Sequence, residues 1–433
     1  MKKILVLILF FLTFTLISCD RKEKVRFLNF KPEVANEFKE ISKKYKKETG
    51  VTLVVETAAS GSYEETLRAR ISTKEAPTIF ICNGPVGYQR WKNYCADLKE
   101  SKLYELLTDK NHVIKDQDKI YGIASTLEGY GIIYNNELCN KYFGLANRQK
   151  EINSMEEINS FNKLETVVKD MDKLKNELGV KGVFGATSLK PGEDWRYHTH
   201  TLDVPLVYEL GNYVAETPKE ITFNYSDNYK NIMDLYMNYS TVDKAILGTK
   251  VVEDSMIEFA LEECVMIQNG NWSESTITSY KGSKVSKDDL RFLPIYTGAL
   301  GEEKQGLCIG TENYLCINNK ASKKEQKMAL DFLEWLFTSE TGKDFVVNKL
   351  GFIPPFSSFD LENTSGSKLS QEVLKWLNKD EIENLNWVTT IIPSHTFKEK
   401  LGANLLRYAQ GKIKWDELVL DAKKDWKEEA SKL

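Results

Sequence analysis

The segment 192–205, with the sequence GEDWRYHTHTLDVP, gathers many side chains that can do chemistry. It contains acids, an arginine, a tryptophan, a tyrosine and two of the four histidines of the chain. Side chains of these types hold metal ions, catalyse hydrolysis or bind polar ligands. The chain must therefore be searched for further residues that would complete one of these sites.

A metal site and a catalytic site both lack partners in this segment. On a strand, His198 and His200 would face the same side, and Asp194 or Asp203 would complete a set of ligands, but only two other histidines exist. A glycosidase needs two carboxylates roughly 5–9 Å apart, whereas Glu193 and Asp194 are adjacent and would point in different directions. No G-x-S-x-G or H-E-x-x-H motif occurs. A binding site for a polar ligand is the favoured hypothesis.

In this hypothesis, 191-PGEDW-195 forms a turn that begins a helix. Asp194, Trp195 and Arg196 would then lie together at the mouth of a loop, where the acid and the guanidinium bind hydroxyl groups and the indole covers an apolar face. The alternative interpretation is an Asp–Arg pair on the surface.

The N-terminus predicts an exported, lipid-anchored protein. Two lysines precede an apolar run from residue 4 to residue 17, which is shorter than the roughly 20 residues that span a bilayer, so residues 1–18 are typical of a signal peptide. Its end, LISC, resembles the bacterial lipobox, in which Cys19 becomes the acylated N-terminus and residues 19–24 a polar tether. Two acyl chains would anchor the protein stably. The alternative is an ordinary signal peptide that contains a cysteine.

Composition restricts the function further. The mature part is long enough for two domains, and 42 % hydrophobic and 11 % aromatic residues can build their cores. A formal net charge of −4 argues against a nucleic-acid binder. The six other cysteines form no C-x-x-C pair, and several lie in apolar runs, where cysteine behaves as a small buried hydrophobe. The sequence leaves open whether any are bridged.

An alternation of strands and helices opens the mature chain. Strands are predicted at 25–30, 51–57 and 78–83, with helices at 32–50 and 63–73, a pattern that indicates a doubly wound α/β sheet. Ligands of such sheets lie beyond the carboxyl ends of the strands. The polar candidates that follow these three strands are Lys31, Glu33, Ser60 and Asn83.

Further candidates lie beside predicted strands later in the chain. The polar break 125–131 separates two strand-like pieces and contains Glu128 and Tyr130. A strand at 264–268 leads through a glycine turn to Asn271 and Trp272, for which core packing is the alternative. A strand pair, 291–296 and 314–318, brackets a glycine-rich stretch that ends in Glu312 and Asn313, and the last third is mostly helical.

Several of these segments, taken in order, resemble one protein family. They are the lipobox, 75-EAPTIFICNGP-85, 120-IYGI-123 with 131-GIIYNNEL-138, 258-EFALEECVMIQNGNW-272, 321-ASKKEQKMALDFLEWLFTSETG-342 and 349-KLGFIPP-355. This order is similar to that of the extracellular solute-binding proteins of sugar ABC transporters, the maltodextrin- and raffinose-binding group. Thr78, Ala124 and Val265 depart from the residues usual in that family.

The resemblance implies a two-lobed, type II periplasmic-binding-protein fold with hinge strands between the lobes. The expected first lobe comprises residues 25–125 and 294–345, and the second comprises 130–290 and 350–433. A carbohydrate, by preference an oligosaccharide, would bind in the cleft without any cofactor or metal. The closed form would be recognised by permease subunits driven by an ATPase, and the membrane would be contacted through the lipid anchor alone.

Two other functions remain open at this point. A binding protein for a different solute, such as a polyamine or a metal chelate, would share the fold. A lipid-anchored glycoside hydrolase would share the affinity for sugars. The candidate ligand-binding residues are Lys31, Glu33, Ser60, Asn83, Glu128, Tyr130, Asp194, Trp195, Arg196, Asn271, Trp272, Glu312 and Asn313.

Overall fold

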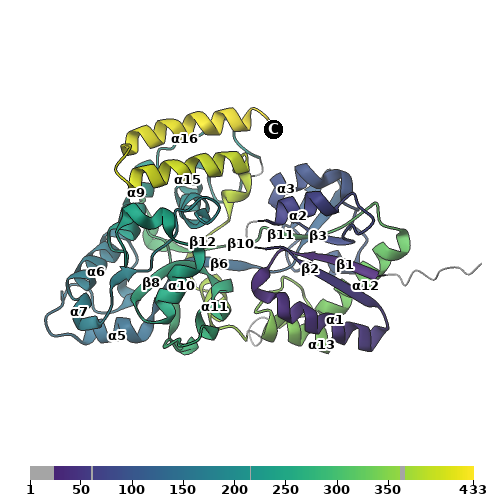
Figure 1. Ribbon diagram of the computed structural model, residues 1–433, viewed down its shortest axis with the longest axis horizontal. Coiled ribbons are helices and arrows are strands. Elements are labelled where there is room, and N and C mark those ends of the chain that lie inside the picture. The colour runs from purple at the N-terminus through teal and green to yellow at the C-terminus, as the bar shows by residue number, and fades with distance from the viewer. Residues whose placement is uncertain (1–23, 60–61, 215, 361–365) are drawn as a thin grey trace, which may run out of the picture.

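The computed structural model describes residues 24–59, 62–214, 216–360 and 366–433. The expected signal peptide, Cys19 and Ser60 lie outside these residues. The chain forms two lobes side by side, each built around its own sheet (Figure 1). No helix in the described part of the chain is both long and apolar enough to cross a membrane.

The first lobe contains a six-stranded sheet in the order β2-β1-β3-β11-β5-β4. β1 is parallel to β2 and β3, whereas β11 is antiparallel to β3 and β5. The strands are β1 (Lys24–Asn29), β2 (Thr52–Thr57), β3 (Ile79–Asn83), β4 (Val113–Asp116), β5 (Lys119–Ala124) and β11 (Asn313–Ile317). The predicted strand–helix alternation is therefore present, and the carboxyl ends of β1 and β3 meet at one edge of the sheet.

Helices cover both faces of this sheet. They are α1 (Ala35–Thr49), α2 (Tyr63–Arg70), α3 (Gly84–Trp91), α4 (Lys102–Leu106), α12 (Lys323–Thr338) and α13 (Glu340–Asp344). Phe38 of α1 and Phe332 of α12 join the apolar core around β1 and β3. Ser322 caps α12 by accepting a hydrogen bond from the backbone N–H of Glu325, which stops the helix from extending further back.

The second lobe contains a sheet in the order β12-β10-β6-β8-β7, and β9 also pairs with β6. The central pairs β6–β8 and β6–β10 are antiparallel. The strands are β6 (Glu128–Asn135), β7 (Gly182–Phe184), β8 (Cys264–Gly270), β9 (Leu290–Leu293), β10 (Gln305–Gly310) and β12 (Glu383–Leu385). Every residue of β6 and of β8 is buried, which places these strands at the centre of the lobe.

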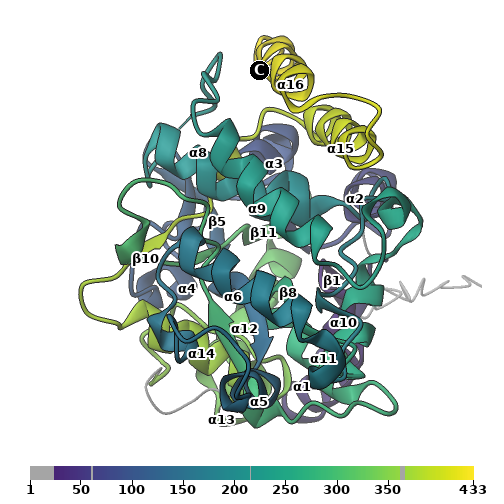
Figure 2. The ribbon, with the colours of Figure 1, turned by 90° about the vertical axis from the view of Figure 1, so that its left-hand side faces the viewer.

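The second lobe carries more helices than the first. They are α5 (Asn136–Gly144), α6 (Phe161–Lys173), α7 (Lys175–Leu178), α8 (Leu202–Leu210), α9 (Ser226–Asn238), α10 (Val252–Ala260), α11 (Glu274–Ser279), α14 (Lys368–Leu377), α15 (His395–Ala409) and α16 (Trp415–Ala430). Figure 2 looks onto this lobe, where α6, α8 and α9 lie across the end that points away from the first lobe. α15 and α16 pack side by side above it.

In the described residues, two crossings of the chain connect the lobes, and both are hydrogen-bonded at the hinge. The first crossing, residues 125–127, joins β5 to β6, and the second, residues 311–312, joins β10 to β11. The backbone N–H of Leu127 in the first crossing donates to the carbonyl of Ile353, which lies between Leu350 and Phe356 of the first-lobe core, at 2.7 Å. The Ser125 N–H donates to the carbonyl of Asn313 at 3.2 Å. The two crossings therefore form one hinge region rather than independent linkers.

The expected lobe boundaries differ from the sheet pairing in two places. The first lobe was expected to resume at residue 294, but β10 pairs with β6 and β12 of the second sheet, so residues up to 310 belong to the second lobe. The glycines of the stretch 297–313 suggested a loop and concealed β10. Phe356 packs in the core of the first lobe, so that lobe also extends beyond the expected residue 345. The strands predicted at 291–296 and 314–318 lie in different sheets.

Candidate functional site

A buried ion pair joins the two lobes next to the hinge. Lys31 follows β1 of the first lobe, and its Nζ lies 2.5 Å from Oε1 of Glu128, the first residue of β6 in the second lobe. The other carboxylate oxygen of Glu128 accepts a hydrogen bond from Nδ2 of Asn313, at 3.0 Å. Glu33 adds a second carboxylate 3.6 Å from Lys31 Nζ. These four sequence-predicted residues are therefore brought together.

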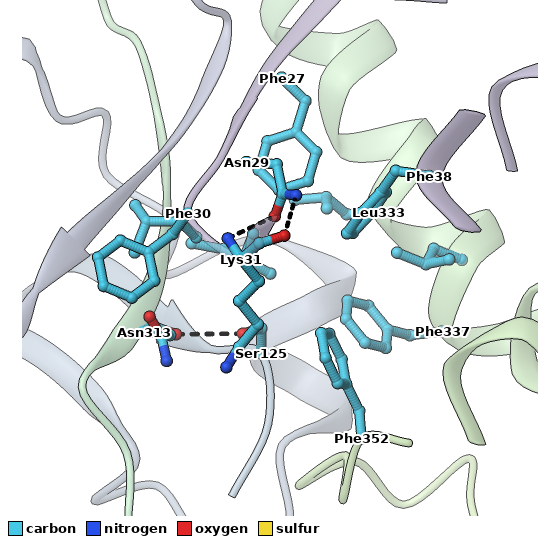
Figure 3. Close-up of a pocket in the computed structure, with 13 residues that line it drawn as sticks. Phe27, Asn29, Phe30, Lys31, Phe38, Ser125, Asn313, Leu333, Phe337 and Phe352 are labelled. Carbon is cyan, nitrogen blue, oxygen red and sulfur yellow. Dashed lines mark hydrogen bonds between the residues drawn. The ribbon is translucent and has the colours of Figure 1, made fainter. Parts of the chain in front are cut away.

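The backbone fixes where the Lys31 side chain begins. Asn29 ends β1, and its amide donates to the carbonyl of Lys31 at 2.7 Å while accepting from the Lys31 N–H at 3.0 Å (Figure 3). This local turn stops the strand and directs the lysine along the hinge. Burial lowers the pKa of Lys31, but the carboxylates of Glu128 and Glu33 outweigh burial and raise it, so the lysine is charged at neutral pH.

Sequence analysis placed Glu128 and Tyr130 in a polar break, which is wrong. Both residues lie within strand β6, and the break is limited to residues 125–127. Glu128 is 4 % exposed and Tyr130 is 1 % exposed. A buried acid needs partners, and Lys31 and Asn313 both bind the Glu128 carboxylate.

A cavity of about 210 Å³ opens beside this ion pair, between the lobes. Its walls carry both acids and amides, with one indole. The lining residues are Lys31, Glu33, Val34, Glu37, Glu128, Asn271, Trp272, Glu274, Ser275, Thr278, Asn348, Lys349, Leu350, Gly351, Phe352, Gly366 and Ser367. Oε2 of Glu37 is buried there and has no hydrogen-bond partner in the described structure. Lys31 Nζ lies 6.0 Å from the ring centre of Trp272 and 5.8 Å from that of Phe352.

Asn271 and Trp272 form a short turn directly after β8. Asn271 Oδ1 accepts from the N–H of Gly129 at 3.1 Å, and its Nδ2 donates to Ser370 Oγ at 3.0 Å. Asn271 is thus occupied by the protein and positions its neighbour. A Cβ added to Gly270 would lie 2.2 Å from the indole of Trp272, so glycine is required for the ring to fold back over the strand.

Trp272 belongs to a group of five rings, which we call the aromatic group: Tyr130, Trp195, His200, Trp272 and Trp387. The ring centres of Trp272 lie 6.4 Å from Trp195, 5.5 Å from His200 and 6.2 Å from Trp387. Tyr130 stacks on His200 at 4.0 Å. Trp195 and Trp272 are half-buried and the other three are buried, so only these two indoles present part of a face outward.

Trp387 was missed by sequence analysis. It follows β12, a strand of three residues, and its indole N–H donates to the carbonyl of Cys308 at 3.1 Å. Lys398 of α15, whose charge opposes the raised pKa of Glu312, was missed as well. A tryptophan in the short, irregular sequence 383-ENLNWVTT-390 carries no periodic signal, and only the pairing of β12 with β10 brings it to the site.

The segment that suggested chemistry most strongly is mostly buried. Asp194 and Arg196 are 3 % and 2 % exposed, so they do not lie at a loop mouth as expected. Asp194 Oδ1 is 3.3 Å from Nε2 of His198. Residues Arg196–Thr201 form a π-helical turn rather than a strand, so His198 and His200 are not paired on one strand face. Burial lowers the pKa of both histidines, which are neutral at pH 7.

Arg196 lies against the aromatic group without an acidic partner. Its guanidinium carbon is 4.2 Å from the ring centre of Trp195, a cation–π contact, whereas its Nε and Nη1 have no hydrogen-bond partner among the described residues. Burial lowers the pKa of Arg196 to about 9, and Glu193 opposes this effect. The guanidinium is therefore buried against the Trp195 ring.

Asn83 and Glu312 lie on the first lobe where it contacts the second. Asn83 ends β3 and pairs in register with Asn313 of β11. The backbone N–H of Gly84 donates to the carbonyl of Glu312 at 3.1 Å. A Cβ on Gly84 would lie 3.0 Å from the side chain of Thr390, which shows how closely the lobes approach here. Burial raises the pKa of Glu312, and Lys398 of α15 offsets part of that shift.

The buried ion pair generates a prediction about stability. Glu128→Gln leaves Lys31 buried without its closest counter-charge, so we expect the free energy of unfolding in urea to fall by about 3–5 kcal/mol. Glu105→Gln removes the acid of an exposed pair with Lys102 and serves as the control, with an expected loss below about 1 kcal/mol. Adding Lys31→Met to Glu128→Gln should restore most of the loss. Equal losses of unfolding free energy in Glu128→Gln and Glu105→Gln would contradict a structural role for the Lys31–Glu128 pair.

Asp203 generates a prediction about pH. It lies beneath Tyr130, its Oδ2 has no hydrogen-bond partner among the described residues, and burial raises its pKa to about 7. The folded state then holds a proton that the unfolded state releases near pH 4, so stability falls as pH rises from about 4 to about 7.

In Asp203→Asn this pH-dependent loss is absent. We expect the stability of the variant relative to the original protein to rise by up to about 4 kcal/mol between pH 4 and pH 8, measured by urea unfolding. Asp227→Asn changes an exposed acid in the first turn of α9 and should show no such trend. A flat difference for Asp203→Asn would mean that its carboxylate is charged throughout.

Comparison with known proteins gives the family. Residues 40–371 match the family described as bacterial extracellular solute-binding protein, which covers most of the chain. No curated protein matches the sequence.

Solved structures of low sequence identity share the fold. A raffinose complex of the solute-binding protein RafE has a TM-score of 0.70 at 17 % identity, covering 94 % of this chain and 99 % of that one. A chitin oligosaccharide binding protein has a TM-score of 0.72 at 16 % identity, covering 94 % and 98 %. Maltose-bound MalE3 of T. maritima has a TM-score of 0.67 at 14 % identity, covering 93 % and 99 %. With its two lobes built on two sheets and this family match, the chain belongs to the bacterial extracellular solute-binding proteins.

Proposed function

We propose that this protein captures a carbohydrate between its lobes and delivers it to the permease of an ABC transporter. The observation that carries the proposal is the cavity between the lobes, in which one indole face lies next to several carboxylates and amides. Sugars present apolar C–H patches and arrays of hydroxyl groups, so they need both kinds of partner in one site. Glu37 Oε2, which lines this cavity and has no hydrogen-bond partner in the described part of the chain, is an acceptor for such a hydroxyl.

The candidate site residues divide into two roles in this proposal. Glu33, Glu37, Glu128 and Trp272 line the cavity and would contact the ligand. Asn271, Asp194 and Arg196 are engaged by the protein and would position the contacting side chains. Asn83, Glu312 and Asn313 come from the first lobe, so binding would draw the lobes together about the hinge.

The comparisons support a sugar over the other solutes considered. The three similar structures named above are a raffinose complex, a chitin oligosaccharide binding protein and a maltose complex. The family binds substrates and hands them on, which favours a receptor without catalysis over a hydrolase. A permease that selects the closed form would then be supplied with loaded receptor, because ligand shifts the population of lobes toward closure.

A panel of mono- and oligosaccharides, read by thermal shift of the mature protein, tests the sugar assignment. A sugar present at 100 times its Kd should stabilise the protein by about 2.7 kcal/mol. Trp272→Ala should weaken binding of that sugar by at least about 2 kcal/mol. Trp335→Ala, a half-buried indole on α12 of the first lobe, is the matched control and should leave the affinity unchanged.

Two further measurements, thermal shift with polyamines and an assay for reducing ends, would contradict the sugar assignment. Polyamines that raise the melting temperature while sugars do not would replace the sugar by a cationic solute, for which the carboxylates of the cavity are the recognising groups. Release of reducing ends from an oligosaccharide would identify a hydrolase.

We expect the protein to be held at the outer face of the cell membrane through Cys19. Expression of the full chain in a bacterial host with labelled palmitate should label the protein, and Cys19→Ser should abolish the label and release the protein from the membrane fraction. Cys139→Ser, which changes a buried cysteine of α5, should remain labelled and membrane-bound. Membrane retention of unlabelled Cys19→Ser would exclude the lipid anchor.

A further inference from the structure

Three cysteines distant in the sequence meet in the core of the first lobe. Cys82 lies on β3, Cys316 lies on the neighbouring strand β11, and Cys95 follows a short turn after α3. Their exposed fractions are 0 %, 0 % and 3 %. Their Sγ atoms all lie within 4.8 Å of one another, and the distance between those of Cys82 and Cys95 is 3.9 Å. We call them the thiol cluster.

The spacing of the sulfurs matches a coordination geometry. An ion bonded to three sulfurs in one plane at about 2.3 Å would separate neighbouring sulfurs by about 4.0 Å. A disulfide, by contrast, needs an S–S distance of about 2.05 Å and would use only two of the three thiols. Gly122 of β5 leaves room next to the cluster, because its Cβ would lie 3.3 Å from Cys316 Sγ.

The chemistry of the donors restricts the ion. All three are sulfurs, which prefer soft ions such as Cu(I), whereas Mg²⁺ and Ca²⁺ prefer oxygen. Zinc takes four ligands in structural sites, and the cluster offers three within the described residues.

We infer that Cys82, Cys95 and Cys316 form a binding site for one Cu(I) ion in three-coordinate, all-sulfur geometry. Each thiol that bonds to the ion releases its proton to solvent, so the affinity rises with pH. The ion joins β3, β11 and the turn after α3, and it stabilises the first lobe. Because none of the three side chains lines the cavity between the lobes, this inference stands apart from the proposed carbohydrate binding.

The test titrates the reduced mature protein with Cu(I) under anaerobic conditions, in competition with a chromophoric Cu(I) chelator. One equivalent should bind, with thiolate-to-copper charge-transfer absorbance in the ultraviolet and a higher melting temperature. Cys316→Ala and Cys95→Ala should each lower the affinity by more than about 100-fold, beyond the loss expected of an outer-shell partner. Cys139→Ala and Cys264→Ala remove isolated buried thiols and should bind copper normally.

Several results would overturn the inference. One is equal copper binding by Cys316→Ala and Cys139→Ala, and another is complete loss of copper to the chelator. Tighter binding of Zn²⁺ than of Cu(I) would show that the thiol cluster does not select a three-coordinate ion. A Cys82–Cys95 disulfide found by mass spectrometry in protein purified from the host would show that the cluster is oxidised instead. Circular dichroism of each variant separates loss of a ligand from loss of the fold.

Discussion

The contact between Lys31 and Glu128 constrains the rest of the site. It joins the end of the first strand of one lobe to the first residue of the central strand of the other, at 2.5 Å and largely buried. A buried ion pair adds little net stability, because removing two charges from water costs about as much as their attraction returns. Its effect is on geometry, since neither charge can move away from the other without being left alone in the core. Asn313 and Glu33 complete the network and make that geometry unique.

The ion pair lies at the hinge, between two lobes that each have their own apolar core. The apolar core of the first lobe and those of the second are distinct, and the contacts between lobes at the hinge are polar and local. Opening the cleft therefore exposes few apolar side chains and mainly exchanges protein partners for water. The hinge hydrogen bonds of Leu127 and Ser125 run through the crossing segments themselves, so they can persist while the lobes rotate.

Sequence analysis found the residues whose positions follow from topology. Lys31 follows the end of β1 and Asn83 ends β3 in a doubly wound sheet, and polar side chains at that edge are expected to converge. The residues whose positions depend on tertiary packing could not be placed from the sequence. The π-helical turn at 196–201 buries Arg196 and turns Asp194 toward His198, and no residue pattern distinguishes this turn from a loop. β10 was hidden by its glycines, and with it the neighbours that bring Trp387 to the aromatic group.

The arrangement of the aromatic group limits how a ligand can be stacked. Tyr130, His200 and Trp387 are buried by one another and by Trp272, so their faces already contact neighbouring rings. Only Trp195 and Trp272 remain half-buried, with ring centres 6.4 Å apart and planes inclined by 39°. Two inclined indoles cannot lie flat against one sugar ring, but each can cover a different ring of a bent oligosaccharide. The carboxylates of the cavity lie on the Trp272 side, whereas Trp195 packs against the buried guanidinium of Arg196. In the proposed binding mode, selectivity should therefore be strongest for the sugar unit next to Trp272.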